Sequence, residues 1–192
     1  MKNKFITDKH VFKMDNYMKI LRVGDILALL FFLIRIRNEH ETMKYYRFLK
    51  LDNAHQILAS LLKLIILSKF RSACDFVIGF HYILLILTTK EKNKVIGICH
   101  FKIRKKSSQT CSLGIVISDQ YAGKGLGTRF LLDSLQYVRK LGFREVTLEV
   151  DKDNLPAYSL YKKLGFISTM EQQKIDYRAV KSIDVISMVL KM

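Results

Sequence analysis

Proline is almost absent from this chain, with one residue among 192, and no long tract of glycine and serine occurs. Such tracts are typical of flexible linkers and low-complexity segments, so the sequence gives no sign of either. No internal repeat is visible. The length suits one domain, and we expect a single domain over residues 18–192 after a loosely structured segment at residues 1–17.

Cysteine is also scarce. Cys74, Cys99 and Cys111 lie far apart, without a C-x-x-C pair or a histidine spacing that suggests zinc. We therefore expect no metal site and three buried or inert thiols. An odd number of cysteines without a recognisable secretion signal fits a reducing cytosol, so the expected location is cytoplasmic.

Long apolar runs are missing. The longest lie at residues 26–34, 57–67 and 76–87, and each is far shorter than the roughly 20 residues that span a bilayer. Residues 1–18 are polar and lack an apolar signal core. We expect buried helices and strands here and no transmembrane segment.

Acidic residues are outnumbered, with 17 Asp and Glu against 33 Lys and Arg, which gives a formal net charge of +16. Such a balance favours anionic partners: nucleotide phosphates, nucleic acid including a ribosome, or an acidic membrane surface. The charge alone does not choose among these partners, and a solvated basic surface explains most individual lysines.

The hydrophobic pattern predicts alternating strands and helices. In the first half we expect a strand at Lys19–Val23, a helix from an N-cap at Asp25 to about Asn38, a helix from about Asp52 to Lys69, and strands at Tyr82–Thr88 and Lys94–Arg104. In the second half we expect a strand at Cys111–Ser118, a helix from Gly125 to about Gly142, a strand at Glu145–Val150, a helix between Asn154 and Gly165, and strands near Phe166–Met170 and Asp184–Leu190. Paired strands combined with strand-helix-strand units imply a mixed α/β sheet.

The segment Ser118-Asp-Gln-Tyr-Ala-Gly-Lys-Gly-Leu-Gly-Thr128 is the most informative one. It follows an expected strand and opens an expected helix. Glycines let the backbone approach a ligand closely, and the helix N-terminus adds partial positive charge, so the segment suits a phosphate or pyrophosphate. A plain tight turn is the simpler alternative. The Walker and dinucleotide-binding patterns both fail on glycine spacing.

Ala122-Gly-Lys-Gly-Leu-Gly127 resembles the pyrophosphate loop of the GNAT N-acetyltransferases, Q/R-x-x-G-x-G/A, with Ala122 in place of the usual Gln or Arg. Asn154-Leu-Pro-Ala-Tyr-Ser-Leu-Tyr-Lys-Lys-Leu-Gly-Phe166 resembles a second segment of that family, N-x-x-A-x-x-L-Y-x-x-x-G-F. The two motifs occur in the family's order, and the resemblance is strong over about residues 94–166. It implies a GNAT fold, with a mixed, mostly antiparallel sheet flanked by helices on both sides.

The resemblance also implies a binding site for acetyl-CoA as co-substrate. It places the pyrophosphate on the backbone of Gly123, Lys124, Gly125, Leu126, Gly127 and Thr128. It places the pantetheine arm along Ile115, Val116 and Ile117 with a hydrogen bond from Asn154. The backbone amide of Val116 or Ile117 would then stabilise the oxyanion.

Catalytic candidates follow from the same resemblance. Tyr161 is the expected acid for the departing thiolate. Many members carry a glutamate base where this chain has Ser112, and serine is too weakly basic. Glu149, 12 residues before Tyr161, matches the base of ribosomal-protein N-terminal alanine acetyltransferases. His100 is a second candidate base. A packing tyrosine and an exposed, salt-bridged glutamate are the alternative interpretations.

The resemblance further implies that the acceptor is a primary amine, either a protein N-terminus or a small amine or amino sugar. Residues 37–41 are one possible acceptor groove, and a solvated helix end is the alternative. A basic enzyme fits a ribosome-bound substrate because ribosomal RNA is anionic. The competing function is a catalytically silent module that binds CoA or nucleic acid, which Ala122 and Ser112 favour.

Overall fold

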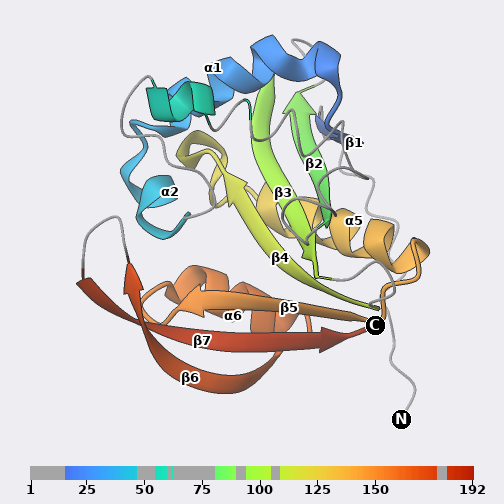
Figure 1. Cartoon of the computed structure of the whole chain (residues 1–192), viewed down its shortest axis with the longest axis vertical. Coiled ribbons are helices and arrows are strands. Elements are labelled where there is room, and N and C mark those ends of the chain that lie inside the picture. Colours follow the sequence, from blue (N-terminus) through green and yellow to red (C-terminus); the bar gives the residue numbers. More distant parts are fainter. Residues whose placement is uncertain are drawn as a thin grey trace.

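The computed structural model of the protein describes residues 16–46, 55–59, 62, 81–89, 94–104, 109–176 and 181–192. Within these residues, seven strands form one sheet in the order β1-β2-β3-β4-β5-β7-β6 (Figure 1). The strands are β1 (Asn16–Ile20), β2 (His81–Thr89), β3 (Val95–Ile103), β4 (Thr110–Ile117), β5 (Glu145–Asp151), β6 (Ile167–Asp176) and β7 (Lys181–Lys191). Every neighbouring pair is antiparallel except β4 and β5. The expected mixed, mostly antiparallel sheet is confirmed.

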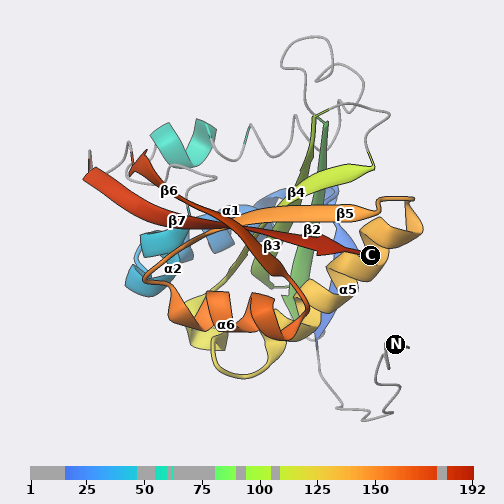
Figure 2. The same ribbon diagram turned by 90° about the horizontal axis from the view of Figure 1, so that it is seen from below.

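Helices cover both faces of the sheet. One face carries α1 (Ile26–Ile36) and α2 (His40–Tyr45), and the other carries α5 (Leu126–Lys140) and α6 (Leu155–Lys163). Side chains alternate along each strand, so β3 turns Ile98 towards the core under α1 and Cys99 towards the core under α5 and α6. Figure 2 shows α5 and α6 along one side of β5 and β7.

The first strand lies three residues earlier than expected. Instead of Lys19–Val23, β1 spans Asn16–Ile20, and Val23–Asp25 forms a 3-10 turn. The Asp25 carboxylate accepts a hydrogen bond from the Arg22 N–H at 3.0 Å and forms an ion pair with Lys19 Nζ at 2.6 Å. Asp25 thus holds the turn that ends the strand. It occupies the N-cap position of α1, but its side chain makes no capping bond there.

Two further elements differ from the prediction. The helix α2 was not expected, and the strand expected at Phe166–Met170 continues to Asp176 as β6. Most of β6 is exposed, so it lacks the apolar signal of a core strand and is held by its pairing with β7. Of the helix expected at Asp52–Lys69, residues 55–59 and 62 are helical, and the rest lies outside the described residues.

Candidate active site

The parallel strands β4 and β5 are paired along only part of their length. The pairs are Thr110 with Glu145, Cys111 with Val146, and Ser112 with Thr147. Beyond Ser112, β4 continues beside β3 to Ile117, while β5 continues beside β7 to Asp151. The two strands therefore diverge towards their carboxyl ends (Figure 1).

The glycine-rich loop leaves β4 at this point. After Ser118 the chain forms a 3-10 turn, Asp119–Tyr121, and then enters α5. Gly123 and Gly125 both adopt left-handed backbone angles, with φ of 70° and 73°. A β-carbon at either position would meet no described atom within 4 Å. Backbone conformation, and not crowding, is what requires glycine here.

Gly125 is the N-cap of α5, so no side chain occupies the helix N-terminus. The N–H groups of Leu126, Gly127 and Thr128 lie in the first turn, where a helix has no intrahelical acceptors for them. The loop residues from Ala122 to Gly125 are exposed. An exposed loop that leads into a helix N-terminus can bind a phosphate.

Two lysines add positive charge beside the loop. Lys124 Nζ donates to the Gln120 carbonyl at 2.8 Å and lies 5.6 Å from the centre of the Tyr121 ring. Lys94 Nζ, from the start of β3, lies 5.8 Å from the same ring. Tyr121 therefore brings both ammonium groups to one end of the loop, where they favour an anion.

The segment Ile115–Ile117 presents its backbone towards the divergence. One edge pairs with β3, through Ile115 with Cys99, Val116 with Ile98, and Ile117 with Gly97. The other edge faces the β5 side, past the last β4–β5 pair. An extended ligand with amide groups can align with that edge in the manner of an added strand.

Asn154 begins α6 on the other side of the divergence. Its Oδ1 accepts the Ala157 N–H at 3.3 Å, and Pro156 occupies the first turn. The N-cap role considered for Asn154 is therefore present. The side chain is half-buried, at the carboxyl end of β5.

Tyr161 lies on α6 and packs into the core on the α5/α6 face. Its ring centre is 5.6 Å from that of Phe166. Burial raises the pKa of the Tyr161 hydroxyl, so the phenol stays protonated at neutral pH. Packing and proton donation are compatible, because the ring fills the core while the hydroxyl keeps its proton.

Glu149 lies on β5, and its side chain points to the opposite face of the sheet. The side chain is 49% exposed and forms an ion pair with Lys174 of β6. Gln172 Nε2 lies 3.5 Å from the same carboxylate oxygen. The salt-bridged glutamate considered as an alternative is thus observed. An exposed pair of this kind is weak.

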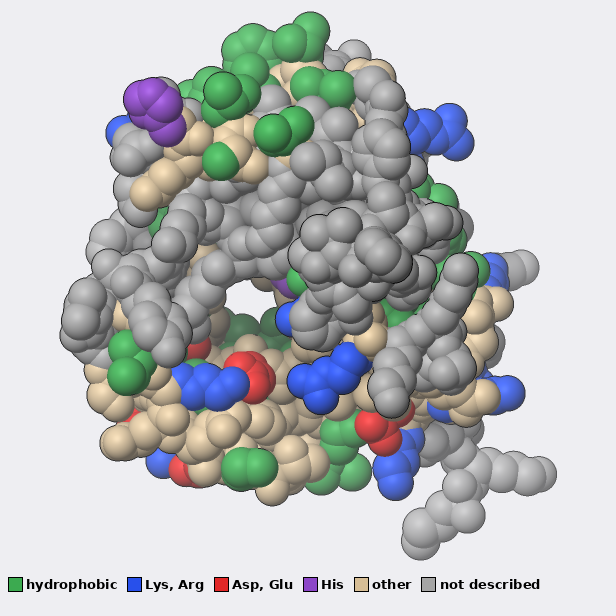
Figure 3. Space-filling model, in the orientation of Figure 1, with side chains coloured by type: hydrophobic (Ala, Val, Ile, Leu, Met, Phe, Trp, Pro, Cys, Tyr) green, Lys and Arg blue, Asp and Glu red, His purple; other side chains and the backbone are tan. Residues whose placement is uncertain are grey.

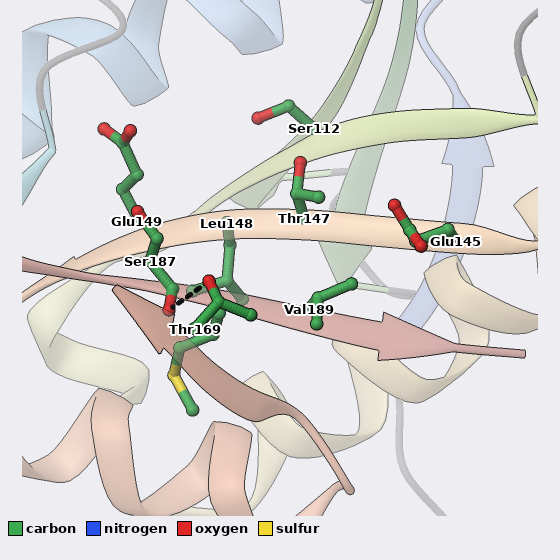
Figure 4. A pocket seen from close by; sticks show the side chains of 9 residues that line it. Ser112, Glu145, Thr147, Leu148, Glu149, Thr169, Ser187 and Val189 are labelled. Carbon is green, nitrogen blue, oxygen red and sulfur yellow. Dashed lines mark hydrogen bonds between the residues drawn. The ribbon is translucent and has the colours of Figure 1, made fainter. Parts of the chain in front are cut away.

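A cavity of about 440 Å³ lies on the α1/α2 face where β4 and β5 separate (Figure 4). Its lining comes from four strands: Ser112, Glu145, Thr147, Leu148, Glu149, Thr169, Ser187, Met188 and Val189. Figure 3 shows a hollow on this face, with basic and acidic side chains close together on its lower rim. The cavity holds carboxylates and hydroxyls, which accept hydrogen bonds from ammonium groups.

Sequence reasoning missed Glu145, Thr147, Thr169 and Ser187 as site residues. The signal for two of them was available, because Glu145, Thr147 and Glu149 occupy alternate positions of one strand and so share a face. Thr169 and Ser187 reach the cavity only through the pairing of β6 and β7 with β5, which no local pattern reveals.

His100, the second candidate base, does not line this cavity. It is buried on β3, with its ring centre 6.3 Å from Tyr46 and 6.5 Å from Tyr82. This environment makes it a packing residue of the α1/α2 face.

The cysteines and the stretch 37–41 are the remaining residues considered in the sequence. Cys99 and Cys111 are buried, as expected, and burial raises the pKa of each thiol to about 12. Cys74 lies outside the described residues. Of the stretch 37–41, Arg37 and Asn38 are exposed, Glu39 reaches towards the end of β4, and the side chains of residues 40 and 41 are outside the described set.

Within the described part of the chain, no group of three or more His, Cys, Asp or Glu side chains is arranged to hold a metal ion. None of the helices in this part is both long and apolar enough to cross a membrane.

Comparison with known proteins places this geometry in context. The chain is 32% identical over 85 residues to a mycothiol acetyltransferase of Pseudarthrobacter chlorophenolicus, which covers 42% of this chain and 26% of that protein. The chain thus spans about a quarter of the length of this relative. Its fold is similar to that of ribosomal-protein-S5-alanine acetyltransferase from Vibrio fischeri, with a TM-score of 0.74 and 16% identity over 92% of this chain and 93% of the other.

A second solved structure with this fold is spermidine N-acetyltransferase from Vibrio cholerae, in complex with CoA and spermine. The TM-score is 0.69 at 17% identity, over 92% of this chain and 95% of the other. The family model for the acetyltransferase (GNAT) family matches residues 51–166, which is more than half of the chain and includes the glycine-rich loop, Glu149 and Tyr161. The chain belongs to the GNAT acetyltransferase family.

Proposed function

We propose that the protein transfers an acetyl group from acetyl-CoA to a primary amine. The observation that carries this proposal is the placement of the glycine-rich loop. It leaves β4 beyond the point where that strand parts from β5 and leads directly into the N-terminus of α5. One ligand with a pyrophosphate and an amide-containing arm can use both features at once.

In this proposal the loop from Gly123 to Thr128 binds the pyrophosphate through backbone N–H groups. The pantetheine arm lies along Ile115–Ile117, and Asn154 faces it from the end of β5. Ala122 replaces a Gln or Arg of the family pattern, but the amides need no particular side chain at that position. Membership of the GNAT family supports this assignment.

Glu149 and Tyr161 are proposed as base and acid. They belong to opposite faces of the sheet, beside the divergence of β4 and β5. Glu149 takes a proton from the amine, directly or through water. The amine nitrogen attacks the thioester carbon, and the N–H of Val116 or Ile117 stabilises the oxyanion. The C–S bond then breaks, and Tyr161 gives its proton to the thiolate.

The cavity favours a small cationic amine as acceptor over a protein N-terminus. Its charged lining residues are the two carboxylates Glu145 and Glu149, in a chain whose net charge is +16. They lie on the same face of β5, roughly 13 Å apart at the usual rise of a strand. Glu149 faces the reacting amine, and Glu145 can hold a second ammonium group of a diamine or amino sugar. The similar structure bound to spermine is in keeping with this acceptor class.

The competing proposal is a module that binds CoA or nucleic acid without catalysis, favoured by Ala122 and by Ser112 at the usual position of a base. Two measurements separate the proposals. Calorimetry tests CoA binding, and thiol release from acetyl-CoA tests turnover with diamines, monoamines, amino sugars and peptide N-termini. We expect binding and turnover, fastest with diamines or amino sugars. Binding without thiol release for any amine would support the silent module, and no CoA binding would reject the site.

A further inference from the structure

Glu39 connects the short link between α1 and α2 to the far end of β4. Its Oε1 accepts a hydrogen bond from Ser118 Oγ at 2.6 Å, and its Oε2 accepts the Asp119 N–H at 2.7 Å. The Glu39 side chain is 10% exposed, and Ser118 is fully buried. Both carboxylate oxygens are therefore engaged with the first two residues after β4.

Arg35 completes this arrangement. Its Nε lies 3.7 Å from Glu39 Oε1, and its Nη2 donates to the Val95 carbonyl at 2.8 Å. A carboxylate removed from water is costly unless it is paired and hydrogen-bonded, and Glu39 has both kinds of partner. Such a contact is well defined and is lost when the carboxylate is removed.

These bonds lie where the chain leaves β4 and enters the proposed pyrophosphate loop. Ser118 is the last residue held by the sheet, through its N–H to the Ile96 carbonyl at 3.0 Å. From Ala122 to Gly125 the loop is exposed. Glu39 thus fixes the direction in which the chain leaves β4, and with it the direction of the amides that follow.

The same segment also reaches the end of β5. Lys44 Nζ lies 3.1 Å from Asp153 Oδ2, and the Tyr45 hydroxyl donates to the Asp153 carbonyl at 3.4 Å. Asp153 directly precedes Asn154. Figure 1 shows α2 beside the carboxyl ends of β4 and β5. The segment from Glu39 to Tyr45 therefore bridges the two strands on the side where they diverge.

We propose that Glu39 is a positioning residue for the pyrophosphate loop, an inference that rests on the proposed binding of CoA. With Glu39 in place the loop is ordered before CoA arrives, so binding does not have to order it. Glu39→Gln keeps the size of the side chain but removes its charge, and its single amide oxygen cannot take the place of both carboxylate oxygens that accept from Ser118 Oγ and the Asp119 N–H. If Glu39 acted only by repelling the negatively charged CoA, Glu39→Gln would strengthen CoA binding, which is the opposite result.

The experiment measures CoA affinity by calorimetry and steady-state constants for acetyl-CoA, in Glu39→Gln and in the control Glu171→Gln. Glu171 is an exposed glutamate of β6 that pairs with Lys152. For Glu39→Gln we expect the Kd of CoA and the KM of acetyl-CoA to rise about 10-fold, with kcat within about 3-fold of wild type. Hydrogen exchange should quicken at residues 119–128 and stay unchanged in β6 and β7. The control should match wild type in all respects.

Unchanged or tighter CoA binding by a folded Glu39→Gln protein would overturn the inference, as would a fall in kcat alone. If Glu39→Gln fails to fold, Ser118→Ala removes one of the same bonds and is judged by the same measurements. Failure of the wild-type protein to bind CoA would instead reject the proposed function, so the two failures are distinguishable.

Discussion

The imidazole ring of His100 on β3 lies directly over the α-carbon of Gly114 on β4. The two residues are register partners, and a β-carbon at residue 114 would stand 2.2 Å from His100 Cε1. The ring is buried, and the ring centres of Tyr46 and Tyr82 lie 6.3 and 6.5 Å from its own. Gly114 is thus a glycine because its partner's ring occupies the space of a side chain.

We expect Gly114→Ala to lower the free energy of unfolding by about 1–3 kcal/mol, since the new methyl group overpacks this site. Urea unfolding measures the loss. Gly24→Ala is the matched control, because a β-carbon there meets no described atom within 4 Å. Combining Gly114→Ala with His100→Ala should recover part of the loss. Independent effects of the two substitutions would contradict the contact.

Gly125 and Gly142 allow a test of the phosphate loop that separates backbone strain from ligand binding. Both have positive φ, of 73° and 94°, and a β-carbon at either meets no described atom within 4 Å. We expect Gly125→Asp and Gly142→Asp each to cost roughly 1–2 kcal/mol of stability. Only Gly125→Asp should abolish CoA binding in calorimetry, because its carboxylate and β-carbon meet the pyrophosphate. Equal CoA affinity in the two variants would exclude the loop as the phosphate site.

Glu149→Gln and Tyr161→Phe test the proposed base and acid. Each keeps the shape of the side chain, so we expect the fold to survive and kcat to fall by roughly 10²–10⁴. The pH profile of Glu149→Gln should lose its acidic limb. Burial raises the pKa of Tyr161, so the wild-type profile should show no alkaline limb from this phenol below its ordinary pKa of 10.0. Near-full activity of both variants at neutral pH would mean that neither group transfers the proton.

Glu145→Gln tests the acceptor class without touching the proposed base. Loss of this carboxylate should raise the KM of a diamine about 10-fold, since a charge-assisted hydrogen bond to the second ammonium group is removed. The KM of a monoamine of similar size should stay the same. Steady-state thiol release measures both. A uniform change for both amines would show that Glu145 does not bind a second ammonium group.

The buried thiols predict weaker folding in alkali. Burial raises the pKa of Cys99 and Cys111 from 9.0 to about 12, so the unfolded chain loses these protons first. The stabilising effect of the neutral thiols is complete below pH 9 and disappears as the pH rises towards 12. Within this window each thiol should lower the free energy of unfolding by up to about 1.4 kcal/mol per pH unit. Urea unfolding at pH 8 and 10 should show a smaller drop for Cys99→Ala combined with Cys111→Ala than for wild type.

The C-terminal half was more predictable than the N-terminal half, for physical reasons. Gly125, Asn154 and Gly165 mark helix ends through backbone angles and caps that depend on a few neighbouring residues, so these boundaries were close to those observed. Asp25 occupies the expected N-cap position, but its carboxylate bonds to Arg22 and Lys19 and not to the first turn of α1.

The candidate site was predictable only where its residues lie close together in the sequence. The glycine-rich loop carries its own signal, and the family resemblance marks Glu149 as a candidate through its 12-residue distance from Tyr161. Ser118 and Glu39 meet across 79 positions of sequence, and Thr169 joins the cavity through strand pairing. Such contacts depend on the order of strands in the sheet, which residue patterns do not specify.

The short pairing of β4 with β5 divides the sheet into two parts. Strands β1 to β4 form one part and strands β5 to β7 form the other. Three residue pairs between β4 and β5 join the two parts. A ligand that contacts both parts of the sheet would add contacts between them. A ligand that binds the folded chain and not the unfolded chain adds about 2.7 kcal/mol to stability at 100 times its Kd. Under the proposed function, acetyl-CoA should therefore raise the melting temperature of the protein.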